Sequence, residues 1–174
     1  MLHRILVLTL LTTTLCSFEI ITETNTEYEK FQRLKQDVLR ASKVGHEYVY
    51  DLTGIDECNK SRLKYLGTVR TSRGNQYKLL TSFHVFRTSN KNCHGASAIE
   101  IYSLKNKFIG EYHVGMRVDL PDELLNKRLI YLTNSEDCNL RKDQSIDLSH
   151  GLPKSFFIRC SKNGGDIYYF SSGD

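Results

Sequence analysis

The chain contains no tryptophan, and after its first 17 residues it contains no long apolar run. A helix that crosses a bilayer needs about 20 consecutive apolar residues, so we expect no transmembrane segment beyond that point. The sequence also lacks any block of basic residues, because its 24 lysines and arginines are interleaved with 20 acidic residues. Nucleic-acid binding usually leaves a clustered basic footprint. The sequence therefore predicts no nucleic-acid partner.

Catalytic and metal-binding signatures are absent as well. The chain has no HExxH pair, no GxSxG elbow, and no histidine or cysteine set at zinc-ligand spacing. Cys93 and His94 are adjacent, but a nucleophilic cysteine needs a free thiolate and a base placed by the fold. We therefore expect a protein that is not an enzyme, with no catalytic residue, no metal site and no cofactor.

The first sixteen residues have the three-part layout of a secretory signal peptide. Arg4 gives a basic start, residues 5–11 form an apolar run broken by one threonine, and small polar residues follow before Cys16. We expect residues 1–16 to be removed and the protein to be exported to a periplasm, a cell surface or the extracellular space. Leu15 is a poor fit to a lipoprotein cleavage site, so a lipid anchor on Cys16 is not expected.

Four cysteines remain after that cleavage, an even number that suits an oxidising compartment. Four cysteines allow three pairings. Cys138 and Cys160 lie in neighbouring turn and strand segments, which favours a bond between them. Cys58 and Cys93 are then left to pair with each other.

One amphipathic helix is expected over about residues 27–44. Thr26 and Glu29 have the form of a capping box, and Gly45 is a natural helix end. Apolar residues follow at helical spacing and would form one buried stripe. The members of this stripe are Tyr28, Phe31, Leu34, Val38 and Ala41.

The rest of the chain reads as short strands separated by turns. Alternating patterns cover residues 63–70 and 77–87, and a hairpin is expected between residues 99–101 and 108–114. Short spacing between strands indicates an antiparallel meander. We expect a single α+β, mainly β domain over residues 17–174, with the helix packed on a curled antiparallel sheet. A partly open barrel and a sandwich both remain compatible with the pattern. Four shorter runs complete the expected strands, at 129–132, 146–148, 156–160 and 167–170.

Several of these segments resemble small exported proteins of Bacteroidetes bacteria. The resemblance covers about residues 60–170 and rests on residues 64–69, 77–83, 107–112 and 119–121. Such proteins are mostly uncharacterised. The resemblance therefore implies a periplasmic or cell-surface setting and no catalytic residues.

The aromatic residues suggest how such a protein would act. Ten tyrosines and eight phenylalanines are present, and the last aromatic run of the sequence, Tyr168 to Phe170, has alternate side chains facing opposite ways. Either one aromatic pair is exposed for binding or both faces are covered. Our first hypothesis is an exported, non-catalytic protein that binds another protein, as an inhibitor, an immunity-type protein or an envelope interaction module. The residues expected on its binding surface are Tyr168, Phe170, His84 and His113.

The alternative hypothesis is a small-ligand carrier, with a pocket inside the curled sheet. Small barrels can hold one small ligand among the side chains that point inward. The residues expected to line such a pocket are Tyr77, Phe83, Phe108, Tyr112 and Tyr131.

Overall fold

The computed structural model describes residues 28–52, 58–87 and 92–173. The expected signal peptide, Cys16 and the capping residue Thr26 lie outside these ranges. Within them, no helix has the length and apolar character needed to cross a membrane.

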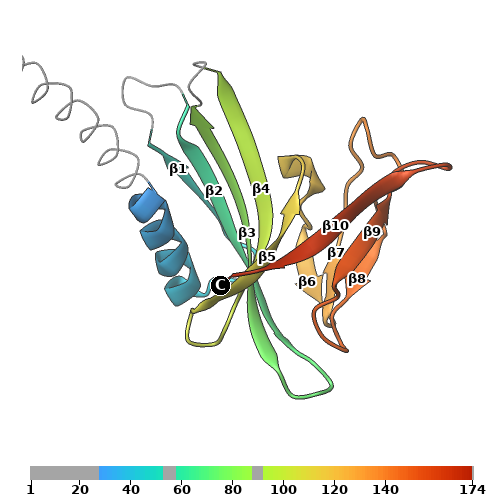
Figure 1. Ribbon diagram of the computed structural model, residues 1–174, viewed down its shortest axis with the longest axis horizontal. Helices are drawn as coiled ribbons and strands as arrows, with labels where there is room; N and C mark the ends of the chain where they lie inside the picture. The colour runs from blue at the N-terminus through green and yellow to red at the C-terminus, as the bar shows by residue number, and fades with distance from the viewer. Residues whose placement is uncertain (1–27, 53–57, 88–91, 174) are drawn as a thin grey trace, which may run out of the picture. The chain divides into compact units, whose positions relative to one another are not determined.

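The chain divides into two compact units, residues 1–37 and residues 38–174. The larger unit carries all the strands of the described residues, and Figure 1 traces them in chain order. It holds the sites considered below.

A helix runs over residues 28–41, so the expected helix exists but ends three residues earlier than the pattern suggested. Ser42 ends it by taking a left-handed backbone conformation, with a φ of 49°, and its hydroxyl donates to the Leu39 carbonyl at 2.7 Å. The predicted stripe is correct at Val38, which is buried, and wrong at Tyr28, which is largely exposed. Leu39 is buried in place of the expected Ala41, which is exposed.

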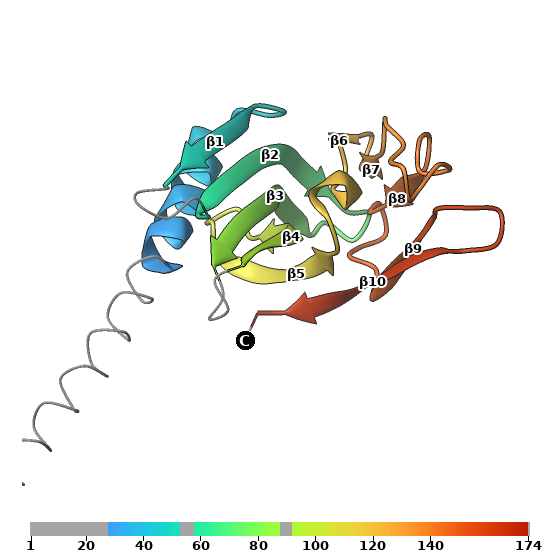
Figure 2. The ribbon, with the colours of Figure 1, turned by 90° about the horizontal axis from the view of Figure 1, so that it is seen from above.

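Seven strands form one antiparallel sheet in the order β1-β2-β3-β4-β5-β10-β9. The first five follow one another as a meander, whereas β10 lies between β5 and β9 (Figure 2). The sheet is open, with β1 and β9 at its two edges. The strands are β1 (Glu47–Asp51), β2 (Lys60–Arg70), β3 (Gln76–Arg87), β4 (Cys93–Tyr102), β5 (Phe108–Val114), β9 (Ser155–Arg159) and β10 (Gly165–Ser172).

A second, smaller sheet contains three short antiparallel strands. These are β6 (Glu123–Leu125), β7 (Arg128–Ile130) and β8 (Ser145–Asp147), paired in chain order. One turn of 3₁₀ helix, η1 (Arg117–Asp119), connects β5 to this sheet. The expectation of a mainly β, antiparallel fold is confirmed, but the strands are divided between two sheets and the larger one is not closed.

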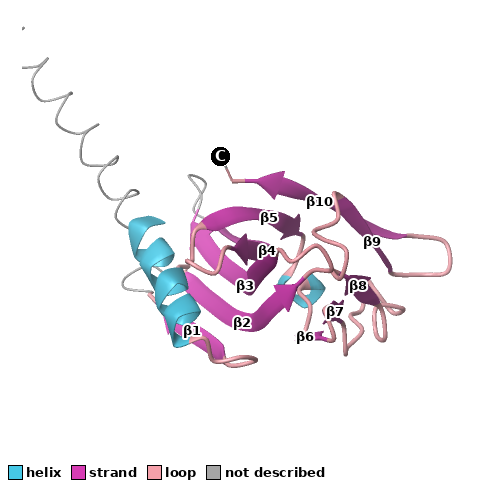
Figure 3. Ribbon diagram, turned by 90° about the horizontal axis from the view of Figure 1, so that it is seen from below, coloured by secondary structure: helices cyan, strands magenta, loops and turns pink. Residues whose placement is uncertain are grey.

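A β-bulge between Tyr65 and Gly67 changes which side chains of β2 share a face. Alternation alone would put Tyr65 and Val69 on one side. Because the bulge adds a residue, the Tyr65 hydroxyl instead bonds Thr68 Oγ1 at 2.7 Å, while Leu66 and Val69 join the main core. Gly67 has a φ of +131°, which side chains rarely allow. Figure 3 shows β2 bending sharply along its length.

The main core lies between one face of the large sheet and the small sheet. β9 and β10 contribute to it through Phe156 and Tyr168, whose ring centroids are 5.3 Å apart. The Phe156 ring also contacts Tyr112 of β5, at 4.9 Å. The cluster contains Leu66, Val69, Leu79, Ile99, Ile101, Tyr112, Val114, Leu129, Tyr131, Cys138, Ile146, Leu148, Phe156, Ile158, Cys160 and Tyr168.

Gly110 makes the insertion of β10 possible. Its backbone pairs with Ser172 of β10. A Cβ at this position would collide with the carbonyl of Ser171 and with the Phe170 ring. The close approach of the two strands therefore requires glycine in β5.

Both disulfide bonds have the predicted pairing. Cys58 is bonded to Cys93, with Cα atoms 5.5 Å apart, and Cys138 is bonded to Cys160, with Cα atoms 4.0 Å apart. The first links the segment before β2 to the start of β4. The second links the loop before β8 to the end of β9.

Candidate functional site

The outer face of the β9–β10 hairpin carries an exposed apolar surface. Phe157 of β9 stands directly opposite Ile167 of β10, and Tyr169 follows Ile167 on the same face. These three side chains are 50%, 53% and 67% exposed. We refer to Phe157, Ile167 and Tyr169 as the hairpin patch.

Strand alternation explains why these residues are exposed. Successive side chains of a strand point to opposite faces, and Phe156, Ile158 and Tyr168 are the ones that enter the core. Their neighbours must therefore point outward. Exposure of large apolar side chains to water is energetically unfavourable for the protein. Three such side chains placed together on a surface are therefore typical of an interaction site.

The hairpin patch lies next to an open sheet edge, because β9 is the last strand of the large sheet. Only part of that edge is covered. The Gln144 side chain accepts a hydrogen bond from the Arg159 N–H at 2.8 Å and donates one to the Arg159 carbonyl at 2.5 Å. Backbone groups of alternate residues point to the same side of a strand, so those of Phe157 point to this same edge.

Three basic residues lie on β9 or close to it in the chain. Arg159 lies two residues after Phe157 on the same face of β9, and Lys154 and Lys162 flank the strand. All three are exposed. The Arg159 guanidinium donates to the backbone carbonyls of Ser161 and Lys162, at 3.2 and 2.9 Å. A partner with acidic groups beside its apolar contacts would complement this arrangement.

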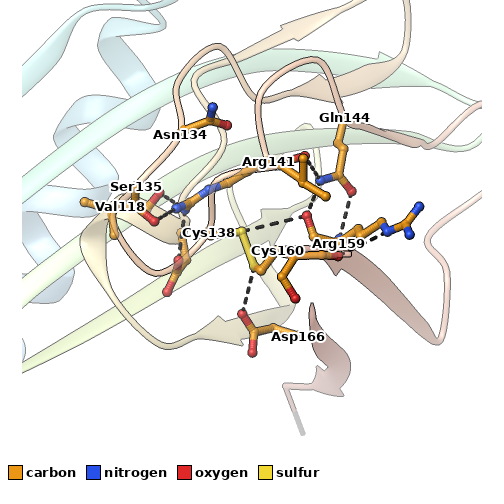
Figure 4. The surroundings of a disulfide bond; sticks show 12 residues. Val118, Asn134, Ser135, Cys138, Arg141, Gln144, Arg159, Cys160 and Asp166 are labelled. Atoms are coloured by element: carbon orange, nitrogen blue, oxygen red, sulfur yellow. Dashed lines mark hydrogen bonds and ion pairs between the residues drawn. A yellow bond between two sulfur atoms is a disulfide. The ribbon is translucent and has the colours of Figure 1, made fainter. Parts of the chain in front are cut away.

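A buried polar network lies in the loop that the Cys138–Cys160 bond joins to β9 (Figure 4). Arg141 is almost fully buried and pairs with the Asp119 carboxylate at 2.9 Å. It also donates to the Val118 carbonyl and to the Ser135 hydroxyl. The Cys138–Cys160 bond fixes the same loop to the end of β9. The disulfide bond thus holds β9, the strand that carries Phe157, against this loop.

The predicted binding surface is wrong at Tyr168 and Phe170. Tyr168 is only 8% exposed and belongs to the core, and Phe170 packs against the Tyr112 ring at 5.2 Å. His113 is exposed as expected. His84 is half-buried, with its Nδ1 atom 2.8 Å from Ser61 Oγ.

The predicted ligand pocket is not formed by its five aromatic residues. Tyr112 and Tyr131 are packed into the core and Tyr77 lies against it. The remaining two lie elsewhere: Phe83 packs over Gly95, and Phe108 packs on the Tyr102 ring at 5.5 Å. A cavity of about 210 Å³ is present in the larger unit, but none of the five lines it.

Cys93, the nucleophile considered in the sequence, and two further polar groups with reactive side chains are engaged in structural contacts. Cys93 is in a disulfide bond, so it has no thiolate to offer. The Ser61 side chain beside His84 is fully buried. The buried Glu100 carboxylate accepts hydrogen bonds from Ser82 and Tyr102, both at 2.5 Å. Across the described ranges, no group of three or more potential ligands could hold a metal ion.

No known protein family, curated protein or solved structure matches the chain. The resemblance to exported bacterial proteins therefore stays a prediction. A functional inference has to rest on the geometry of this chain.

Proposed function

We propose that the protein is an exported, non-catalytic interaction module that binds another protein through the β9 edge and the hairpin patch. The single observation that carries this proposal is the direct pairing of Phe157 with Ile167 on an exposed face, with Tyr169 beside them. Export rests on the signal-like N-terminus and on the two disulfide bonds, which favour an oxidising compartment.

The binding mode follows from the edge strand. An extended segment of the partner can add to β9 by hydrogen bonding to the outward-pointing backbone groups of Phe157. Its apolar side chains would cover the hairpin patch, and acidic side chains would meet Lys154, Arg159 and Lys162. Main-chain bonds then supply affinity, while the patch and the basic groups supply specificity.

The test compares the unaltered mature protein with the double variant Phe157→Ser and Tyr169→Ser. Val49→Ser is the matched control, because Val49 is 55% exposed on β1, the opposite edge strand of the same sheet. The proposal expects that a stoichiometric partner can be isolated from the exported proteins of the native cell. This partner should bind both the unaltered protein and the control. Binding to the double variant should be weaker by at least about a hundredfold.

Hydrogen exchange provides a second readout. Strand addition should slow exchange of the Phe157 amide when the partner binds, because that N–H becomes hydrogen-bonded. A partner that binds all three proteins equally, or that leaves this amide unprotected, would contradict the proposed site. Failure to find any partner that discriminates the double variant would also count against it.

A further inference from the structure

The cavity of about 210 Å³ has a polar floor built from three neighbouring strands. Glu47 of β1 pairs with Lys64 of β2, which in turn pairs with Thr81 of β3. The same row continues to Ile99 and Tyr112, which are buried in the core. One end of the row is therefore core and the other end is a polar hollow.

The remaining wall comes from η1 and the loops that follow it. Arg117 and Asp122 add charged groups, and Val118, Leu120 and Pro121 add apolar surface. The hollow combines cations with a small apolar wall, which is the usual composition of a site for a small polar ligand.

Two cations that line the cavity, Lys64 in its floor and Arg117 in its wall, have donors to spare. The Lys64 ammonium has three N–H groups and donates to the Asp122 carbonyl at 2.7 Å. Lys64 forms no ion pair with a carboxylate in the described part of the chain. Arg117 bonds Glu47 through Nη2 alone, at 3.2 and 3.3 Å, so most of its five N–H groups are uncommitted.

The charges do not cancel around the hollow. Glu47 is held by Arg62 at 2.8 Å as well as by Arg117. Burial opposes its ionisation, but hydrogen bonds and the positive charges of these two guanidiniums outweigh burial and lower the pKa of Glu47. The charge of Arg62 balances that of Glu47. Of the other charged groups at the cavity, Lys64 and Arg117 are positive and Asp122 is negative, which leaves a net charge of one positive unit.

We propose that this cavity binds a small monocarboxylate. Its carboxylate would accept hydrogen bonds from Lys64 and Arg117, and its short apolar body would lie against Val118, Leu120 and Pro121. The volume corresponds to roughly seven water molecules, which limits the ligand to a compact acid. This site is separate from the hairpin patch, and the inference does not depend on the proposed protein partner.

The probe is isovalerate, a branched acid of suitable size, and its neutral amide isovaleramide is the chemical control. Isothermal titration calorimetry measures affinity, and amide shifts in nuclear magnetic resonance spectra locate the site. The proposal expects isovalerate to bind, to shift amides around Lys64 and residues 117–122, and to bind at least about tenfold more tightly than isovaleramide.

The variant Lys64→Gln tests the main contact, and Lys60→Gln is its matched control. Lys60 lies on the same strand, where it forms an exposed pair with Asp51 at 3.9 Å. We expect Lys64→Gln to weaken isovalerate binding by about tenfold or more and Lys60→Gln to leave it unchanged. Arg117→Gln, which alters an exposed side chain, is a second test that does not risk the fold and should weaken binding likewise.

Several results would overturn the proposal. These are equal binding by the unaltered protein and both cavity variants, equal binding of the acid and its amide, and no saturable binding of isovalerate at millimolar concentrations. A peptide ending in leucine addresses a different source of the same carboxylate. Tighter binding of that peptide than of isovalerate would assign the cavity to a chain terminus and reject a free acid.

Discussion

The side-chain amide of Gln144 bonds both backbone groups of Arg159, its oxygen accepting from the N–H and its nitrogen donating to the carbonyl. It thereby occupies the position that a neighbouring strand would take on β9. The covered edge ends there, since the next backbone groups on this side belong to Phe157. An added strand would start where the Gln144 amide stops.

Replacement of Gln144 should reveal how much this contact stabilises the hairpin. Gln144→Ala removes the two bonds to Arg159 and a third to the Leu140 carbonyl. Because Arg159 is exposed and water can replace part of what is lost, we expect the free energy of unfolding to fall by about 1–2 kcal/mol. Urea denaturation measures the change.

Gln144→Glu sharpens this prediction. A carboxylate can accept from the Arg159 N–H but cannot donate to either carbonyl, so this variant should also be destabilised. Gln76→Ala, at an exposed position at the start of β3, is the control and should unfold like the unaltered protein. Equal stability of all four proteins would show that the Gln144 contacts contribute nothing.

Much of the strand pattern could be read from the sequence, because alternation and turn residues are local signals. The β4–β5 hairpin was predicted with β5 at its observed position but with only the last part of β4, because the prediction began at residue 99 and β4 begins at Cys93. The four later strands were predicted within one or two residues of their observed ends. The short strands β1 and β6 were not predicted. The Cys138–Cys160 pairing was predictable because the two residues lie only 22 positions apart.

The sequence could not show which face of each strand is buried. Alternation separates Tyr168 from Tyr169, but the choice between them depends on the side on which β9 and β10 meet the small sheet. The bulge at Tyr65 and Gly67 could not be predicted either. An extra residue moves every later side chain of the strand to the opposite face, and the composition of the strand gives no sign of it. The polar floor of the cavity could not be predicted either, since Glu47 and Thr81 become neighbours only through the pairing of three strands.

Arg141 should be one of the more costly residues to replace. Its guanidinium is buried beside Asp119, and removing it leaves Asp119 Oδ1 and the Val118 carbonyl without their donor. We expect Arg141→Met to lower the free energy of unfolding by about 3 kcal/mol or more. Thermal and urea unfolding both measure this.

The control for Arg141 is Arg128→Met. Arg128 is exposed and pairs with Asp147 at 3.4 Å. Exposed ion pairs contribute at most about 1 kcal/mol, so the control should lose little stability. Comparable losses for the two variants would contradict the structural importance given to the buried network.

The two disulfide bonds should respond differently to mild reductant. Cys93 lies in an exposed segment, whereas Cys138 and Cys160 are both buried. Because thiolate attack requires access to a sulfur atom, the Cys58–Cys93 bond should be reduced first. Alkylation at increasing times, followed by peptide mass spectrometry, gives the order, and earlier labelling of Cys138 and Cys160 would refute it.

Loss of the second disulfide bond should still be costly. The Cys138–Cys160 bond closes a loop of 22 residues, for which chain entropy gives about 3 kcal/mol of stabilisation. The double variant Cys138→Ser and Cys160→Ser should therefore unfold at a lower urea concentration. It should also expose the hairpin to faster hydrogen exchange than the rest of the sheet. Uniform exchange across the sheet would show that this bond does not brace the hairpin in particular.

High pH should unfold the protein through its buried tyrosines. Burial raises the pKa of the Tyr112, Tyr131 and Tyr168 hydroxyls above their ordinary value of 10.0. The unfolded chain then releases these protons first, so stability is intact below pH 10 and falls as pH rises beyond it, by at most about 1.4 kcal/mol per pH unit for each tyrosine. Circular dichroism and tyrosinate absorbance should therefore show one cooperative transition. Tyr131→Phe should make it less steep, whereas Tyr169→Phe, at an exposed site, should not; the same slope in both variants would contradict this origin of alkaline unfolding.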